Sequence, residues 1–119
     1  MSHQGLCSSQ SAGDQSEVLI LDGDFDRSNA AQFEDALDDA LHAGRPQLVV
    51  DLRGVISLDS TMLSVLIRSL GDALAEDSRL ALIRPNPAVW RVFVLTGLSQ
   101  TFPAYGRLDE ALAGFEPSA

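Results

Sequence analysis

The stretch Leu48–Leu70 constrains the fold of this chain more than any other part of the sequence. It begins with the apolar run 48–50, which ends at Asp51 and Leu52 and is typical of a strand buried on both faces of a sheet. Apolar residues then recur at the spacing of one helix face, at Leu63, Leu66, Ile67, Leu70 and Leu74. The stretch therefore predicts a buried strand that leads directly into an amphipathic helix.

Three residues that can cap a helix, Asp59, Ser60 and Thr61, lie at the junction between this strand and this helix. The first N–H groups of a helix have no partner inside it, and the positive end of the helix dipole lies beside them. A hydroxyl at this position is therefore next to a favourable place for a phosphate. Taken alone, the three residues would be interpreted as a simple helix cap without modification.

The rest of the chain alternates between strand patterns and helix patterns. Further strands are predicted over 17–21, 79–83 and 100–105, and helices are predicted after Ser28 or Asn29, after the Asn86 cap, and over 108–113. This alternation predicts an α/β fold with a single-layer mixed, mostly parallel β-sheet of four to five strands and helices packed on it.

A chain of 119 residues is long enough for one domain with a real core. The polar segment Met1–Ser16 offers little to bury, and we expect a flexible N-terminal tail there. The segment Gly5-Leu6-Cys7 is too weak a pattern to predict a strand. We therefore expect the domain to span residues 17–115, followed by a C-terminal tail over 116–119.

The first predicted strand ends in an acidic turn, Asp22-Gly23-Asp24-Phe25-Asp26. Aspartate favours turns, so a solvated turn and a functional turn are both open. Clustered aspartates can also hold Mg²⁺, but no further signature of a dedicated metal site is present. The sequence therefore predicts neither a metal nor a cofactor.

The net charge of the chain limits the kinds of partner that it can bind. The formal net charge is −9, and all eight basic residues are arginine. Nucleic acids and anionic membranes require a basic face, so we expect no direct nucleic-acid binding and no membrane insertion, whereas a basic protein partner fits. The single cysteine, Cys7, excludes an internal disulfide. The pattern of a signal peptide and the long apolar run of a membrane span are both missing, which favours a cytoplasmic protein.

The D-S-T step, the V-V-D-L strand before it and the L-S-V-L helix after it resemble the STAS domain, whose best-known members are bacterial anti-sigma-factor antagonists. The resemblance extends over about 17–113. The acidic turn resembles the family's G-E-L-D turn, and V-W-R-V-F-V-L-T-G-L resembles its helix V-x-R-L-F-x-x-x-G-L. The chain departs from the family at Met62-Leu63-Ser64, where the family usually has Gly-Leu-Gly.

This resemblance implies a protein switch and not an enzyme. The unmodified form would bind an anti-sigma factor that is also a serine kinase of the GHKL ATPase type, which frees the sigma factor. Phosphorylation of Ser60 would release the kinase, and a PP2C-like phosphatase would reset the switch. The resemblance also implies a partner-binding surface, formed by Asp24, Asp26, Asp59, Thr61 and Met62. Met62 is expected either to crowd the approach of a kinase to the Ser60 hydroxyl or to define a different partner surface.

Three other interpretations compete with a STAS switch. A serine hydrolase would need a base beside Ser60, and the only histidines are His3 and His42. A receiver domain would use Asp51 as phosphoacceptor together with a lysine, and the chain has no lysine. The third alternative is a constitutive STAS scaffold subunit of a stressosome-like or lipid-transport ATPase complex, and the sequence leaves it open.

Overall fold

The computed structural model describes residues 5–75 and 79–115, with the side chains of 73–75 excepted. Along the chain the elements are β1 (Leu6–Ala12), β2 (Ser16–Phe25), α1 (Ala30–Leu41), β3 (Gln47–Leu58), α2 (Ser60–Ala75), β4 (Arg79–Ile83), α3 (Pro87–Leu95), a 3₁₀ turn (Leu98–Gln100), β5 (Ala104–Tyr105) and α4 (Leu108–Gly114). No helix in these ranges is long and apolar enough to cross a membrane.

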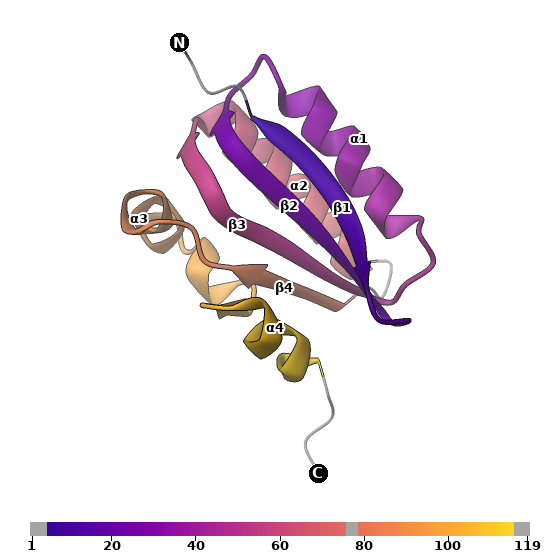
Figure 1. The fold of residues 1–119 in the computed structure, drawn as a ribbon. Helices are drawn as coiled ribbons and strands as arrows, with labels where there is room; N and C mark the ends of the chain where they lie inside the picture. Colours follow the sequence, from indigo (N-terminus) through magenta and orange to yellow (C-terminus); the bar gives the residue numbers. More distant parts are fainter. Residues whose placement is uncertain (1–4, 76–78, 116–119) are drawn as a thin grey trace.

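The five strands form one sheet in the order β1-β2-β3-β4-β5 (Figure 1). β1 pairs antiparallel with β2, and every other neighbouring pair is parallel. The predicted single-layer, mixed and mostly parallel sheet is therefore confirmed. Because β2, β3 and β4 run the same way, their carboxyl ends lie at one edge of the sheet, where the following loops lead into helices.

The core has two parts because alternate residues of a strand point to opposite faces of a sheet. Leu48, Val50 and Leu52 of β3 belong to the larger cluster, which includes apolar residues of α1, α2 and α3. Val49, between them, belongs to a smaller cluster with Ala111 and Phe115 at the α4 end of the chain. Helices therefore cover both faces, which explains why the sequence of β3 is apolar without alternation.

The structure corrects the prediction for the N-terminal segment. Residues 6–12 form β1, paired with β2 from Leu6 opposite Asp22 to Ala12 opposite Ser16. The strand is mostly exposed, so it has no apolar run to detect, and its backbone pairing with β2 holds it in place. The predicted boundary at residue 17 therefore omits a strand of the sheet.

The remaining differences are at element ends. The last strand was predicted over 100–105 but covers only Ala104–Tyr105, because residues 98–100 form the 3₁₀ turn. The predicted end of the α2 helix near Asp77 and the predicted tail at 116–119 lie outside the described residues.

Candidate functional site

Ser60 is the first residue of α2, and it is exposed at the carboxyl edge of the sheet. β3 runs to Leu58, and the parallel pairing of β2 and β3 places Phe25 beside Leu58 and Asp24 beside Ser57. The acidic turn and the Ser60 junction, which are far apart in the sequence, are therefore neighbours in space.

Asp59 connects these two segments. One carboxylate oxygen accepts a hydrogen bond from the Met62 N–H at 2.8 Å, which makes Asp59 the cap of α2. The other oxygen accepts from the Arg27 N–H at 3.2 Å, and the Asp59 N–H donates to the Phe25 carbonyl at 3.1 Å. The prediction that the D-S-T step caps a helix is confirmed, and the capping side chain is that of Asp59.

Asp26 is exposed and is held in a tight local turn. Its Oδ1 accepts hydrogen bonds from the Ser28 hydroxyl at 2.5 Å and from the Ser28 N–H at 2.8 Å. The hydroxyl bond is the main cause that lowers the pKa of Asp26, with the Ser28 N–H next. Because both bonds favour the ionised form, Asp26 keeps its negative charge at neutral pH.

Asn29 has a role in the site that the sequence does not predict. The sequence indicates only a possible helix cap, but the Asn29 side chain makes no capping bond to α1. Instead, its Oδ1 accepts from the Asp26 N–H and its Nδ2 donates to the Asp24 carbonyl, each at 2.9 Å. Asn29 is only 2% exposed, so it fixes the acidic turn from inside. The proximity of Asn29 to three aspartates was the available signal.

Asp24 is half-buried, and it accepts a 2.6 Å hydrogen bond from the Ser57 hydroxyl on the neighbouring strand. This contact orients the carboxylate across the end of the sheet. The structure therefore brings Asp24, Asp26, Asp59 and Ser60 to one edge. Among the described residues, however, no group of three acidic, histidine or cysteine side chains is arranged to hold a metal ion.

Thr61 is exposed beside Ser60, whereas Met62 is fully buried in the larger core cluster, with 0% of its surface exposed. Successive helix residues are rotated by about 100°, so the third residue of α2 turns away from the surface that carries the first. The prediction that Met62 crowds the Ser60 hydroxyl or contacts a partner is therefore wrong. Its methionine fills core volume beneath the site.

A shallow apolar groove lies close to Ser60 along the sequence, between the end of β3 and α3. It has a volume of about 220 Å³, and its lining residues are Ile56, Ser57, Leu58, Ala88, Val89 and Val92. Ile56 is 52% exposed although it lies in the middle of an apolar stretch. The sequence analysis did not predict this groove, because its two sides come from segments about thirty residues apart.

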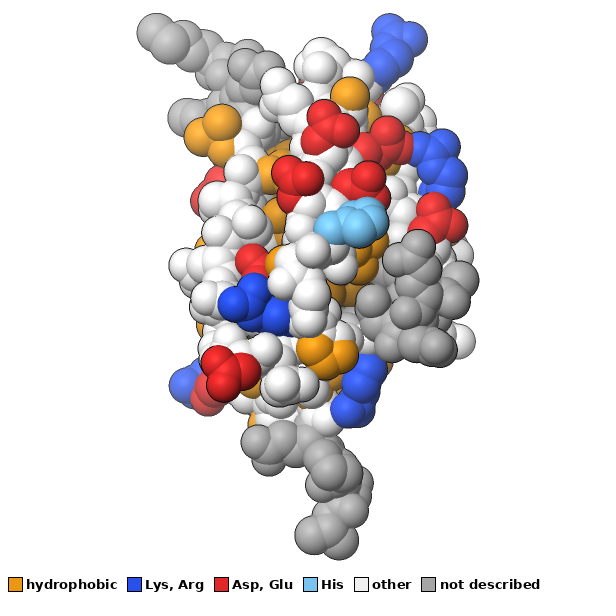
Figure 2. All heavy atoms as spheres, turned by 90° about the vertical axis from the view of Figure 1, so that its right-hand side faces the viewer, with side chains coloured by type: hydrophobic (Ala, Val, Ile, Leu, Met, Phe, Trp, Pro, Cys, Tyr) orange, Lys and Arg blue, Asp and Glu red, His pale blue; other side chains and the backbone are white. Residues whose placement is uncertain are grey.

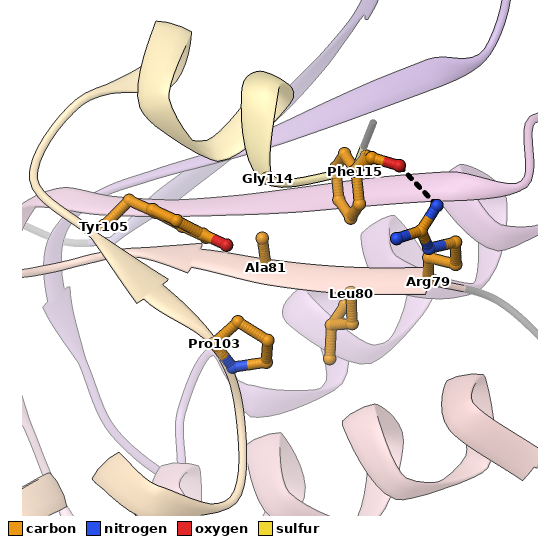
Figure 3. A pocket seen from close by; sticks show the side chains of 7 residues that line it. All are labelled: Arg79, Leu80, Ala81, Pro103, Tyr105, Gly114 and Phe115. Carbon is orange, nitrogen blue, oxygen red and sulfur yellow. Dashed lines mark hydrogen bonds between the residues drawn. The ribbon is translucent and has the colours of Figure 1, made fainter. Parts of the chain in front are cut away.

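A second hollow, of about 240 Å³, lies between β4, β5 and the end of α4 (Figure 3). Arg79 donates a hydrogen bond to the Phe115 carbonyl there, and its guanidinium lies over the Phe115 ring at 5.6 Å from the centroid. None of the predicted site residues lines it. This hollow is therefore separate from the Ser60 site.

The structure also argues against the serine hydrolase and the receiver domain as interpretations of this chain. His42 follows α1 at the end of the sheet where β3 begins, whereas Ser60 follows the end of β3, so the 12 residues of β3 separate them. Asp51 is buried, and its carboxylate accepts two hydrogen bonds from the Arg53 guanidinium, at 3.0 and 2.7 Å. His42 is thus not placed as a base for Ser60, and Asp51 is not an open acceptor. His3 lies outside the described residues.

Comparison with known proteins identifies the family to which this fold belongs. The pattern of the family described as "Mlab, STAS domain" matches residues 8–108, which is most of the chain. The chain belongs to the STAS domain family. A STAS-fold crystal structure of an anti-sigma factor antagonist from Mycobacterium paratuberculosis superposes with a TM-score of 0.84 at 30% identity, covering 93% of each chain. The resemblance identified from the sequence is therefore confirmed.

Two further proteins are similar to this chain over most of its length. The anti-sigma-F factor antagonist RsfB of Mycobacterium tuberculosis is 28% identical over 97 residues, which are 82% of this chain and 79% of RsfB. The anti-sigma factor antagonist SpoIIAA in its unphosphorylated form has a TM-score of 0.75 at 18% identity, covering 94% of this chain and all of SpoIIAA. At that identity the likeness to SpoIIAA concerns the fold alone.

Proposed function

We propose that this STAS domain is an anti-sigma factor antagonist that binds an anti-sigma factor while Ser60 is unmodified and releases it when Ser60 is phosphorylated. The observation that carries the proposal is the exposed hydroxyl of Ser60 at the first position of α2, beside the acidic turn. The names of the relatives that match over most of the chain support it. The protein acts by binding and not by catalysis.

The position of Ser60 suits a switch that leaves the fold intact. A phosphate on Ser60 would lie at the positive end of the α2 dipole, beside first-turn N–H groups of which that of Met62 is already bonded to Asp59, so it does not strain the fold. It adds a charge of about −1.5 to −2 next to Asp59 and near Asp24 and Asp26. A partner surface that fitted the neutral hydroxyl would then face a concentrated negative field. A loss of about 2.7 kcal/mol in binding free energy weakens affinity about a hundredfold.

The docking surface that we propose combines charge and apolar contact. Asp24 and Asp26 offer carboxylates to a basic partner, and the groove at Ile56 offers exposed apolar area on the same edge of the sheet. Asp59 and Thr61 flank Ser60, are both exposed, and belong to the same proposed surface. Desolvated apolar contacts with charges at the rim are typical of specific protein interfaces.

The enzymes of the cycle follow from the family resemblance. A GHKL-type serine kinase, which is the anti-sigma factor itself, would phosphorylate Ser60, and a PP2C-like phosphatase would remove the phosphate. This cycle takes place in the cytoplasm. The antagonist itself needs no cofactor, because the phosphoryl group comes from ATP bound by the kinase, which releases ADP.

Phosphopeptide mapping after incubation with the cognate kinase and ATP tests the modification. We expect phosphate on Ser60 and, at most, traces on Thr61. Ser60→Ala should abolish labelling, and the matched variant Thr61→Ala should keep it. Phosphate on Thr61 alone would contradict the assignment. If the kinase binds the wild type but never labels it, the constitutive scaffold subunit becomes the better interpretation.

Calorimetric titration of the same kinase tests the docking surface. Asp24→Ala, Asp26→Ala and Ile56→Asp should each weaken binding, by about tenfold or more, since each removes a contact at the proposed interface. Ile67→Asp is the matched control, because Ile67 is also exposed, at 40%, but lies along α2 beyond its first turns. If all four variants bind the kinase with the affinity of the wild type, the interface lies elsewhere.

A further inference from the structure

The outer edge of β1 is an open sheet edge with unusual chemistry. β1 is the last strand on its side of the sheet and, among the described residues, pairs only with β2. Its seven residues, L-C-S-S-Q-S-A, include no charged side chain and no proline. Charged side chains and proline are the usual features that prevent an edge strand from pairing with another chain. The backbone groups of this edge are therefore available to an added strand.

The surroundings of this edge are strongly acidic. Residues 5–44, which form β1, β2 and α1, carry nine acidic side chains and a single arginine, Arg27. Their formal charge is −8, so this part of the chain holds almost all of the net charge of −9. An uncharged strand edge thus lies within a negative field, which attracts cationic partners and accelerates their association.

α1 places part of this charge beside β1. The two elements are in contact and run along the same side of the molecule (Figure 1). Glu34 of α1 is directed toward α2, where it forms an ion pair with Arg68. At about 100° per residue from the buried Leu37, Asp35 points away from the sheet into solvent, and Asp39 lies on the side of α1 opposite to Glu34, toward β1. Figure 2 shows acidic side chains gathered in one patch on this side of the molecule.

We propose that the outer edge of β1 binds an extended, basic segment of a partner protein as an additional strand of the sheet. Backbone hydrogen bonds to residues 6–12 supply the anchoring, as in other cases of strand addition. Alternate side chains of the added strand lie on the α1 side of the sheet, the side on which Cys7 packs against the larger core cluster. Arginine or lysine at every second position on this side therefore lies in the negative field of α1, with Asp39 nearer to it than Asp35.

A second copy of this chain is a poorer occupant of the same edge. Antiparallel pairing of two β1 strands would continue the sheet and bring the two α1 helices together on one face. Each copy would then present its −8 half to the other, and like charges at such a junction are unfavourable. The charge pattern selects a basic partner over self-association.

This surface is centred away from the Ser60 site and approaches it only at the Leu6 end, where the Gly5 N–H donates to the Asp24 carbonyl. Ser9, in the middle of β1, lies opposite Leu19, which is five residues before Asp24 along β2. At about 3.3 Å per residue, the centre of the edge is roughly 17 Å from the acidic turn. A segment bound there can be held in both states of Ser60, so the proposal goes beyond the proposed function and does not depend on it.

The experiment uses the full chain and a synthetic nine-residue peptide in which arginine alternates with threonine. Amide hydrogen exchange and chemical shifts are followed by NMR during titration. We expect slower exchange within residues 6–12. Two analogues, N-methylated at the odd or the even positions, separate strand addition from plain charge attraction. One of them should bind about tenfold more weakly than the parent, because it loses the backbone donors that face β1.

The variant Asp35→Asn/Asp39→Asn should also bind the peptide about tenfold more weakly. Asp72→Asn is the matched control, because Asp72 is an exposed helical aspartate on α2, and its affinity should equal that of the wild type. The proposal is overturned if both N-methylated analogues bind like the parent, or if the protected amides lie outside β1. It is also overturned if the chain alone dimerises with protection of residues 6–12, which would make a second copy the occupant. None of these results involves Ser60.

Discussion

Met62 carries a different role from the one that its place in the sequence indicates. It follows the proposed phosphoacceptor by two residues, yet its side chain is fully buried and contributes to the core that joins α2 to the sheet. The Ser60 hydroxyl, by contrast, is on the solvent side of the same helical turn. Neighbours in the sequence therefore divide between function and stability within one turn of helix.

For Met62→Ala we expect a loss of about 2–5 kcal/mol in the free energy of unfolding, because the substitution leaves a cavity in the core. The phosphorylation rate of the folded variant should stay at the wild-type value, since Met62 does not contact the hydroxyl. A urea melt and an initial-rate assay on the same preparation measure both quantities. Thr61→Ala, an exposed change, is the control and should alter stability by no more than about 0.5 kcal/mol. A faster rate for Met62→Ala would restore the idea of an obstructing side chain.

Asn29 is expected to support the acidic turn more than any aspartate in it. Asn29→Ala leaves the Asp26 N–H and the Asp24 carbonyl without their buried partner, which costs about 1–3 kcal/mol of stability. Asn86→Ala is a matched control, because Asn86 also bonds one N–H and one carbonyl, those of Val89 and Val55, but is itself exposed. Chemical denaturation should show the larger loss for Asn29→Ala. Equal losses would mean that burial of the amide adds nothing.

At the scale of elements, the stability of β1 depends on the rest of the sheet. Only Cys7 and Ala12 of this strand are half-buried, and they pack against opposite core clusters. The strand gains its order from the ladder with β2, whose own side chains are buried almost throughout. A polar segment is thus fixed by an apolar neighbour.

The reactivity of the Cys7 thiol reports whether β1 is paired with β2. Burial raises its pKa to about 11, above the usual value of about 8.5, because desolvation disfavours the thiolate. At pH 8 the folded chain then holds roughly a hundredfold less thiolate than the unfolded chain. Reaction with a disulfide reagent should be slowed by about that factor, and the difference should vanish in concentrated urea. Rapid reaction of the folded protein would show that β1 detaches easily from β2.

At the scale of the whole molecule, two electrostatic effects of opposite sign act on the stability of the Ser60→Asp variant. The added charge increases the repulsion within a chain that already carries −9, but it also lies at the positive end of α2. We expect these effects to offset each other, so that the free energy of unfolding changes by no more than about 0.5 kcal/mol while binding of the anti-sigma factor is lost. Thermal melts at low and at physiological salt measure the first quantity. Unfolding of the variant would contradict a switch that leaves the fold intact.

The sequence by itself determined the elements whose signal is local. The apolar run of β3, the helical spacing behind Ser60 and the cap at Asn86 each lie within a few residues, and all three elements appear in the structure. β3 continues past its predicted end at Leu52 to Leu58, and Ile67 of the predicted helix face is 40% exposed. The alternation of strands with helices also determined the mostly parallel sheet, because parallel strands require crossover helices.

Only the tertiary structure decided the features that depend on distant partners. β1 became a strand because β2 offered it a ladder, and Met62 turned inward because α2 docks on the sheet with that face. Asn29 joined the site because its buried amide found two backbone groups of the acidic turn, and the groove at Ile56 arose where β3 meets α3. In each case the free energy comes from contacts between segments. Only Met62 has a periodic signal in the sequence, because it lies four residues before Leu66 and eight before Leu70 on the buried face of α2.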